Sequence, residues 1–314
     1  MRAAFYRQYG DNQVLTIGEL PDPKVGPGEV LVEVRCAGVN PVDWKVMSGG
    51  LDALMNVYFP VVPGWDVSGV VTAVGLDTPE YSVGDEVIAY ARKDVLSGGT
   101  FAELVTAPVR TLARKPQSLG FDQAAGLPLA GLTAYQLLTR LGTKPGETVL
   151  VHAAAGGVGS LAVQVARVLG ARVIGTASER NHDVVRSLGA EPVSYGEGLV
   201  ERVRALAPAG VDVVADFVGG VLADTLAVLA PSGRHASVAD PTVTASGGTY
   251  LWVRPDAADL ATLARWADQG DLTVPLAGVF DLDQVADAFA LSQDGHARGK
   301  IVIRVSGGKP PAQG

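Results

Sequence analysis

Cysteine is almost missing from this chain, and histidine is scarce. The single cysteine, Cys36, excludes an internal disulfide and a zinc site built from several cysteines. The four histidines, His152, His182, His235 and His296, share no spacing that is typical of metal ligands. We therefore expect no bound metal.

Long apolar runs and basic runs are also absent from the sequence. No apolar stretch approaches the roughly 18 residues that suggest a membrane-spanning helix, and the first residues lack the apolar core of a signal peptide. Lys and Arg number 25 against 33 Asp and Glu, which gives a net charge of −8. We expect a cytoplasmic protein that has neither a membrane nor nucleic acid as its partner.

What is present is enough apolar sequence for two domains. The chain has 314 residues, of which 47% are hydrophobic and 18% charged. Residues 1–121 contain short β-branched runs separated by Gly, Pro and Asp turns, which predicts a small, partly open barrel. The strands expected there are Val30–Val34, Val67–Val74, Glu86–Tyr90 and Phe101–Val105.

From about residue 122, helical stretches alternate with short β-branched runs, which predicts a parallel, doubly wound sheet. The strands expected in residues 122–254 are Thr148–His152, Arg172–Thr176, Pro192–Tyr195, Val211–Val218 and Arg234–Val238. Residues 255–305 hold two further helices and two strands that can return to the first domain. Residues 306–314 read as a disordered tail. The fold class is therefore α/β, with a β-rich domain beside a doubly wound parallel sheet.

A glycine cluster follows the first strand of the predicted parallel sheet. Val149–Val151 leads into a turn, and a helical pattern opens directly after it. Strand, glycine turn and helix in this order form a site for a dinucleotide pyrophosphate, because glycine permits close approach and the helix start offers free N–H groups. The expected cofactor-binding residues of this loop are Ala154, Gly156, Gly157, Val158 and Gly159.

The next strand indicates which dinucleotide is bound. An acidic residue that would bind the ribose is expected near Ala177 or Ser178 and is absent there, although Glu179 is one residue further along. Ser178 and Arg180 suit a 2′-phosphate instead, because a guanidinium binds phosphate with two hydrogen bonds. The sequence therefore predicts NADPH. The alternative is that Ser178 caps the next helix and Arg180 is a solvent-exposed charge.

Later strand ends are also expected to face the cofactor. In open α/β sheets ligands bind at the carboxyl ends of the strands, which places Phe217, Val218, Gly219 and Val238 there. A plain turn is the alternative for the glycines. Asp216 is expected to be structural.

Several motifs carry a resemblance to a known family over residues 1 to about 305. They are Pro27–Val32, Ala37–Asp43, Pro63–Val71, Val83–Val87, Leu132–Tyr135, the glycine loop and Arg298–Ile303. With these motifs the chain resembles the zinc-free quinone oxidoreductase, or ζ-crystallin-like, branch of the medium-chain dehydrogenase/reductase superfamily.

The resemblance implies a GroES-like catalytic domain built from residues 1–121 and 255–305, and a Rossmann domain over residues 122–254. It also implies NADPH, a homodimer, and Tyr195 beside the 2′-phosphate, where the alternative is an ordinary aromatic at a strand end. The segment Gly247–Val253 reads as an edge strand. In relatives a strand at this position pairs across the dimer, which would satisfy its free backbone groups.

The zinc-binding members of the superfamily differ from this chain at their ligand positions. Those positions correspond here to Asn40, Trp65 and Leu129, and the proton-relay hydroxyl corresponds to Val42. None of these side chains binds zinc as a thiolate or an imidazole would. The resemblance therefore implies hydride transfer to an activated acceptor, a quinone or an α,β-unsaturated carbonyl, without a Lewis acid.

Few residues of the sequence are candidates for the chemistry itself. Asn40 is expected to donate to the acceptor oxygen or to the cofactor carboxamide, or else to be a turn-former. Tyr58 is a candidate proton donor, or only a wall of the pocket, and solvent is an alternative source of the proton. Thr133 and Lys300 are expected to contact the cofactor; the alternatives are a helix hydroxyl and a surface lysine.

Some neighbouring residues are expected to support the site. Asp43 and Asp66 are expected to be hydrogen-bonded structural carboxylates. Trp65, Trp252 and the loop Ala91–Gly99 are expected to shape the substrate pocket or its rim.

Two other functions remain open from the sequence. The scaffold is also compatible with a pathway-specific enoyl reductase or cyclising enzyme of secondary metabolism, since loops decide such uses. A third hypothesis is a non-catalytic NADPH-binding structural or sensor protein. Turnover of a panel of acceptors separates the three.

Overall fold

The computed structural model describes residues 1–305; the predicted disordered tail lies outside them. The chain divides into two units, which are described separately. Of the described residues, unit 1 contains Met1–Leu129, Pro255–Gly270 and residues 274–305, and unit 2 contains Ala130–Arg254 with Asp271–Thr273. Within the described residues no helix combines the length and the apolarity needed to cross a bilayer.

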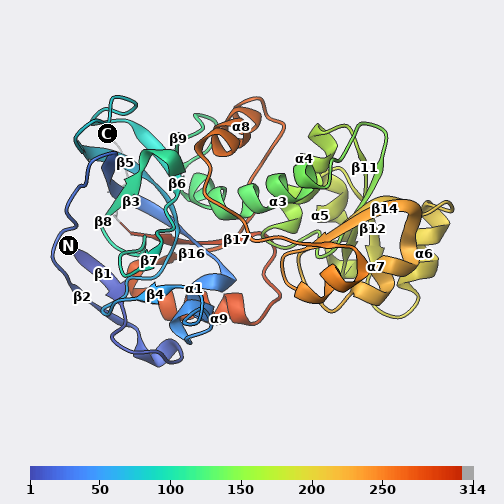
Figure 1. The fold of residues 1–314 in the computed structure, drawn as a ribbon, viewed down its shortest axis with the longest axis horizontal. Helices are drawn as coiled ribbons and strands as arrows, with labels where there is room; N and C mark the ends of the chain where they lie inside the picture. Colours follow the sequence, from blue (N-terminus) through green and yellow to red (C-terminus); the bar gives the residue numbers. More distant parts are fainter. Residues whose placement is uncertain (306–314) are drawn as a thin grey trace, which may run out of the picture. The chain divides into compact units, whose positions relative to one another are not determined.

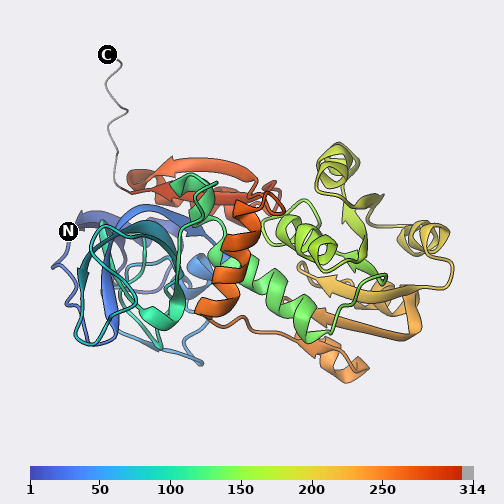
Figure 2. The same cartoon turned by 90° about the horizontal axis from the view of Figure 1, so that it is seen from above.

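Unit 1 is built around a seven-stranded sheet that joins early and late parts of the chain. Its order is β16-β17-β3-β5-β6-β9, and β8 also pairs with β3. Figures 1 and 2 show the late strands, in red, beside the blue and teal early strands. The strands are β3 (Glu29–Val39), β5 (Asp66–Val74), β6 (Glu86–Tyr90), β8 (Leu104–Pro108), β9 (Leu112–Arg114), β16 (Leu276–Asp281) and β17 (Lys300–Arg304).

Two small strand pairs and several helices complete unit 1. β1 (Arg2–Phe5) pairs with β2 (Thr16–Glu19), and β4 (Asn56–Val57) pairs with β7 (Val95–Leu96). Its helices include α1 (Pro41–Met47), α2 (Phe121–Ala125), α8 (Ala257–Asp268) and α9 (Val285–Gln293), while α3 (Pro128–Arg140) begins in unit 1 and continues into unit 2. A core of alternating strand residues holds the unit together, with Phe289 of α9 packed against Phe101 at 5.9 Å between ring centroids.

The predicted boundary after residue 121 lies slightly too early, because unit 1 continues to Leu129. The structure puts α2 in unit 1, because Phe121 and Ala125 pack with Cys36 of β3 and Val302 of β17. Strand β8 also begins later than the predicted Phe101–Val105. Phe101 instead donates its N–H to the carbonyl oxygen of Pro63 and accepts the N–H of Ala4, so it links the Pro63 loop to strand β1 before β8 begins.

Unit 2 is a six-stranded parallel sheet with the order β12-β11-β10-β13-β14-β15. The chain starts in the middle with β10, so the direction of winding reverses between β10 and β13, where such sheets bind ligands. The predicted doubly wound sheet is confirmed. The strands are β10 (Thr148–Val151), β11 (Arg172–Ala177), β12 (Glu191–Ser194), β13 (Val211–Asp216), β14 (Leu229–Ser237) and β15 (Thr249–Tyr250).

Helices cover both faces of this sheet because its strand residues alternate between the faces. On one face Ile174 contacts a buried cluster that includes Leu199 and Val203 of α6 (Leu199–Leu206) and Val228 of α7 (Leu222–Val228). On the other face a Cβ on Gly175 would lie 2.9 Å from Val185 of α5 (His182–Ser187). Helix α4 (Gly159–Val168) packs on β10 and β11.

Candidate functional site

The glycine loop between β10 and α4 is held against the neighbouring strand β11. Ala153 and Ala154 donate their N–H groups to the side-chain and main-chain oxygens of Thr176, at 3.1 and 2.9 Å. Ala153 has a positive φ of 56°, which turns the chain sharply. A Cβ on Gly159 would lie 2.1 Å from the Ala153 carbonyl oxygen. Only glycine therefore allows the helix to start this close to the strand end.

The start of α4 is open toward a ligand. The N–H groups of Ser160 and Leu161 already donate to the carbonyl oxygens of Gly156 and Val158. The N–H groups of Gly157, Val158 and Gly159 have no partner within the described residues, as is usual at a helix start, and the N-cap residue Val158 offers no side-chain hydrogen bond. These groups and the helix dipole favour an anion. A Cβ on Gly156 would meet only the Ala153 oxygen, at 3.3 Å, so this side of the loop leaves space. The loop thus fits the pyrophosphate of a dinucleotide.

The residues expected at the 2′-phosphate lie on two adjacent strand ends. Ala177 of β11 is in register with Ser194 of β12, so Ser178 and Tyr195 follow paired positions at the same edge of the sheet. Ser178 makes no side-chain capping bond. Arg180 is exposed, and Tyr195 is 60% exposed. Within residues 1–305 the guanidinium of Arg180 has no acidic partner, so it is available to a ligand.

The end of β13 forms a tight turn organised by Asp216. Its Oδ1 accepts the N–H groups of Val218 and Gly219, both at 2.9 Å, and its Oδ2 accepts the hydroxyl of Ser237 at 2.6 Å. Both carboxylate oxygens are thereby used, as expected of a structural residue. Phe217 directly follows β13 and Val238 directly follows β14. The two segments are joined, since the N–H of Val238 donates to the Asp216 carbonyl oxygen.

Two further polar residues of unit 2 are buried. Burial lowers the pKa of His152, whose ring nitrogens lie 3.5 and 3.3 Å from the hydroxyls of Thr176 and Thr225. These contacts give His152 a structural place beneath the glycine loop. Thr133, on α3, is also buried, and its contact with a cofactor stays a prediction.

Unit 1 contains a buried polar network that the sequence did not predict. The ammonium group of Lys300 donates to the main-chain oxygen of Val39 and to Oδ1 of Asn40, and lies 3.9 Å from Oδ2 of Asp66. Nδ2 of Asn40 donates to the same Asp66 oxygen at 2.9 Å. The other Asp66 oxygen accepts the N–H of Leu129 at 2.9 Å. The carboxamide of Asn40 is therefore fixed at both ends.

Strand register explains why these three residues meet. Val39 pairs with Ile301 and Gly38 with Asp66, so the end of β3 and the starts of β5 and β17 lie at one end of the sheet. Lys300 is only 3% exposed, so the alternative of a surface lysine is wrong. Burial raises the pKa of Asp66 to about 6, while Lys300 opposes the rise; burial also lowers the pKa of Lys300.

Asp43 has one oxygen that the chain leaves unused. Its Oδ2 accepts the N–H of Asn40 at 2.7 Å, which fixes the start of α1. Its Oδ1 is buried and has no hydrogen-bond partner among the described residues. Burial raises the pKa of Asp43 to about 8, with the Asn40 N–H opposing the rise. The structural role expected of Asp43 thus accounts for its Oδ2 but not for its Oδ1.

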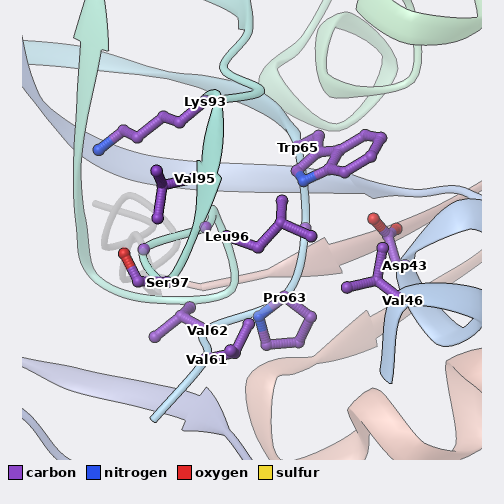
Figure 3. A pocket seen from close by; sticks show the side chains of 13 residues that line it. Asp43, Val46, Val61, Val62, Pro63, Trp65, Lys93, Val95, Leu96 and Ser97 are labelled. Atoms are coloured by element: carbon purple, nitrogen blue, oxygen red, sulfur yellow. The ribbon is translucent and has the colours of Figure 1, made fainter. Parts of the chain in front are cut away.

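Asp43 also lines a pocket in unit 1 whose other walls are mostly apolar. Figure 3 shows its carboxyl group on the side of Trp65, and the ammonium group of Lys93 on the opposite side, directed away from it. Lys93 donates to the hydroxyl of Thr106 at 2.7 Å. The lining residues are Asp43, Val46, Val61, Val62, Pro63, Gly64, Trp65, Lys93, Val95, Leu96, Ser97, Gly98 and Gly99. Trp65 and most of the loop Ala91–Gly99 therefore shape a pocket, as the sequence suggests.

The raised pKa of Asp43 predicts how stability changes with pH. Between the ordinary value of 3.8 and about 8, the unfolded chain releases this proton and the folded chain keeps it. Stability contributed by Asp43 therefore falls as the pH rises through that interval. Asparagine does not titrate and can still accept the Asn40 N–H. We expect Asp43→Asn to lose less unfolding free energy than the wild type between about pH 5 and about pH 8.

Urea denaturation of both proteins at several pH values measures this difference. Asp66 and Lys300 titrate in both proteins, so their contributions largely cancel in the comparison. Parallel pH profiles for the two proteins would show that Asp43 is ionised in the folded state.

The positions that correspond to zinc ligands hold other chemistry here. Asn40 is engaged in the polar network, Trp65 packs against Tyr90 at 6.0 Å between ring centroids, and Leu129 is apolar. In the part of the chain that the structure describes, no group of three or more His, Cys, Asp and Glu side chains is arranged to hold a metal.

Tyr58 lies apart from the pocket lining. It is 63% exposed and follows β4, and its N–H donates to the carbonyl oxygen of Leu96 at 2.9 Å. It is thus attached to β7, whose residues do line the pocket. A catalytic role for Tyr58 stays a prediction.

Comparisons with known proteins agree with this geometry. A model of the alcohol dehydrogenase GroES-like domain matches residues 26–117, and a zinc-binding dehydrogenase model matches residues 188–303. The chain is 36% identical, over 313 residues, to the chloroplastic NADPH-dependent alkenal/one oxidoreductase of Arabidopsis thaliana, which covers 96% of this chain and 79% of that protein.

Two further matches span nearly the whole of both chains. The chloroplast envelope quinone oxidoreductase homolog of Arabidopsis thaliana is 32% identical over 96% of this chain and 98% of its own length. The structure of the quinone oxidoreductase from Coxiella burnetii superposes with a TM-score of 0.85 and 33% identity, over 98% of this chain and 99% of that one. The chain therefore belongs to the medium-chain dehydrogenase/reductase superfamily, in its ζ-crystallin-like quinone oxidoreductase branch.

Proposed function

We propose that this chain is an NADPH-dependent oxidoreductase that passes a hydride to a quinone or an α,β-unsaturated carbonyl compound without a zinc ion. The observation that carries the proposal is the set of groups at the carboxyl ends of the parallel strands in unit 2. There an uncapped glycine-loop helix, the hydroxyl of Ser178 and the unpaired guanidinium of Arg180 follow adjacent strands β10 and β11. The relatives named above, an alkenal/one reductase and quinone oxidoreductases, support the choice of acceptor.

Bound NADPH would supply the hydride, and the chain must orient the acceptor and stabilise the negative charge that develops on its oxygen. We assign the second task to Asn40. Its Nδ2 carries two hydrogens, and Asp66 accepts one of them. The second is left for the acceptor oxygen or for the cofactor carboxamide. Because Lys300 and Asp66 hold the carboxamide, this donor needs little reorganisation during the reaction.

Zinc independence rests on the side chains at the corresponding positions. A zinc ion needs thiolate, imidazole or carboxylate ligands, and Asn40 and Trp65 provide none. Conjugated acceptors do not require a Lewis acid, because the charge spreads from the β-carbon onto the oxygen.

The experiment is the oxidation of NADPH and of NADH in the presence of p-benzoquinone, phenanthrenequinone or a long-chain alkenal. We expect turnover with NADPH that persists after treatment with a chelator. Loss of activity in the chelator would contradict zinc independence. Tight NADPH binding without turnover of any acceptor would favour a specialised reductase or a non-catalytic protein instead.

The cofactor preference has its own test in Ser178 and Arg180. Two charge-assisted hydrogen bonds of about 1.5–3 kcal/mol each can account for a preference of about a hundredfold or more. We expect the double variant Ser178→Ala, Arg180→Met to raise the Kd for NADPH by about a hundredfold and to leave the Kd for NADH within a factor of about two. Calorimetric titration measures both constants.

Arg186 provides a matched control for that test. It is a nearby exposed arginine on α5 that already pairs with Asp183 at 2.7 Å. Arg186→Met should leave both dissociation constants unchanged. Equal losses for NADPH and NADH in the Ser178/Arg180 variant would remove the 2′-phosphate assignment.

The proposal also includes a cytoplasmic location and a homodimer. Support for the dimer comes from β15, which is the last strand of its sheet and pairs with β14 on one side. Tyr250, the last residue of β15, and Trp252, two residues further on, are partly exposed aromatic side chains. Sedimentation of the purified chain measures the oligomeric state.

A further inference from the structure

Arg202 of α6 binds the segment that follows strand β12. Its Nε donates to the carbonyl oxygen of Ser194 at 3.0 Å, and one terminal nitrogen donates to the carbonyl oxygens of Gly196 and Glu197 at 3.4 and 2.8 Å. These acceptors lie on both sides of Tyr195. A single side chain thus holds the turn that carries Tyr195.

This turn would be loose without such a contact. Gly196 and Gly198 have positive φ angles of 85° and 75°, and glycine at such positions gives the chain wide conformational freedom. A rigid guanidinium is suited to this task because its donors have a fixed planar arrangement. Arg202 therefore restricts where the ring of Tyr195 can lie.

The guanidinium of Arg202 also has no direct contact with a carboxylate of the described residues. Among residues 1–305 its donors meet only carbonyl oxygens. Arg180 follows the neighbouring strand β11 and likewise has no acidic partner. Ala177 and Ser194, the last residues of β11 and β12, are in register. Both cations therefore lie at the carboxyl ends of the strands. Glu179, Glu197 and Glu201 are the exposed acids closest to them in sequence.

We propose that Arg202 is a positioning residue that selects for the 2′-phosphate of NADPH. It holds the Ser194–Glu197 turn so that Tyr195 lies beside Ser178, where the phosphate is proposed to bind. The inference rests on the proposed NADPH cofactor and adds a residue outside the expected phosphate ligands.

The test is the binding of NADPH and NADH to the full chain carrying Arg202→Met or Arg202→Lys. We expect Arg202→Met to raise the Kd for NADPH about tenfold and to change the Kd for NADH less than about twofold. Lysine keeps the charge, but its ammonium does not reproduce the planar fork. Arg202→Lys should therefore give a smaller loss that is still specific to NADPH.

Arg204 is the matched control on the same helix. It is equally half-buried and also donates to carbonyl oxygens, those of Pro208, Ala227 and Leu229. Leu229 is the first residue of β14. Arg204 therefore lies near the amino ends of the parallel strands, whereas Arg202 lies near their carboxyl ends. Arg204→Met should lower Tm without changing the ratio of the two dissociation constants.

A double-variant cycle with Tyr195→Ala separates positioning from charge. If Arg202 acts through Tyr195, Arg202→Met should cost less than about threefold in NADPH affinity once the ring is gone. Equal losses for NADPH and NADH, or a full loss in the Tyr195→Ala background, would overturn the inference. A wild type that binds NADH as tightly as NADPH would defeat the cofactor proposal as well, whereas an unchanged preference in Arg202→Met would defeat this inference alone.

Discussion

Replacing Lys300 by methionine is expected to lower the free energy of unfolding by about 3–5 kcal/mol, because it leaves a buried charge without its partner. Methionine can occupy much of the same space. It cannot donate to the Val39 and Asn40 oxygens, and it leaves the carboxylate of Asp66 without a cation. Urea denaturation near neutral pH measures the loss.

Two controls separate this effect from ordinary loss of packing. Lys115 also has a largely buried stem, but its partner Glu86 is half-exposed and can be solvated when the lysine is removed. Lys115→Met should therefore cost less than Lys300→Met. The double variant Asp66→Asn, Lys300→Met removes both charges and should be more stable than Lys300→Met alone. A double variant that is no more stable would show that Asp66 is not charged in the folded protein.

Alanine at Gly159 is expected to weaken NADPH binding at least about tenfold and to destabilise the apoprotein by about 1–3 kcal/mol through overpacking. The new Cβ would lie 2.1 Å from the Ala153 oxygen and 2.9 Å from the Ala154 Cα. Both are backbone atoms that cannot rotate aside. Either the helix start or the loop must therefore move, and the N–H groups that face the phosphates move with it.

Gly156→Ala is the matched control for this variant. It lies in the same loop, and its Cβ would meet nothing nearer than 3.3 Å. Its melting temperature should stay close to that of the wild type, and its NADPH affinity then reports how closely the phosphates approach the loop. A Gly159→Ala protein with unchanged Tm and Kd would contradict the close helix–strand packing described here.

The parts of this fold that the sequence predicts are those set by local pattern. The strand Glu86–Tyr90 and the strand–glycine–helix unit around Gly159 are encoded by short apolar runs and by turn residues beside them. The sequence also predicts that Ser178 and Tyr195 each follow a strand. It does not show that the two strands are neighbours, which the register of β11 and β12 in the structure does.

The buried network could not be predicted in the same way. Asn40, Asp66 and Lys300 are ordinary polar residues at strand ends, and their meeting depends on the register of three antiparallel strands far apart in the chain. Arg202 is hidden for a similar reason. A charged residue on an amphipathic helix indicates a solvent-exposed face, and nothing local shows that it reaches back to the turn after β12.

The position of β17 between β16 and β3 has a consequence for biosynthesis. The ribosome delivers β3 and β5 long before β17, whereas all of unit 2 has been delivered by Thr273. The parallel sheet can therefore form while the β-rich unit still lacks an interior strand. During that interval Asp66 is without the lysine that neutralises it, so nascent unit 1 cannot bury this carboxylate at low cost until the last part of translation.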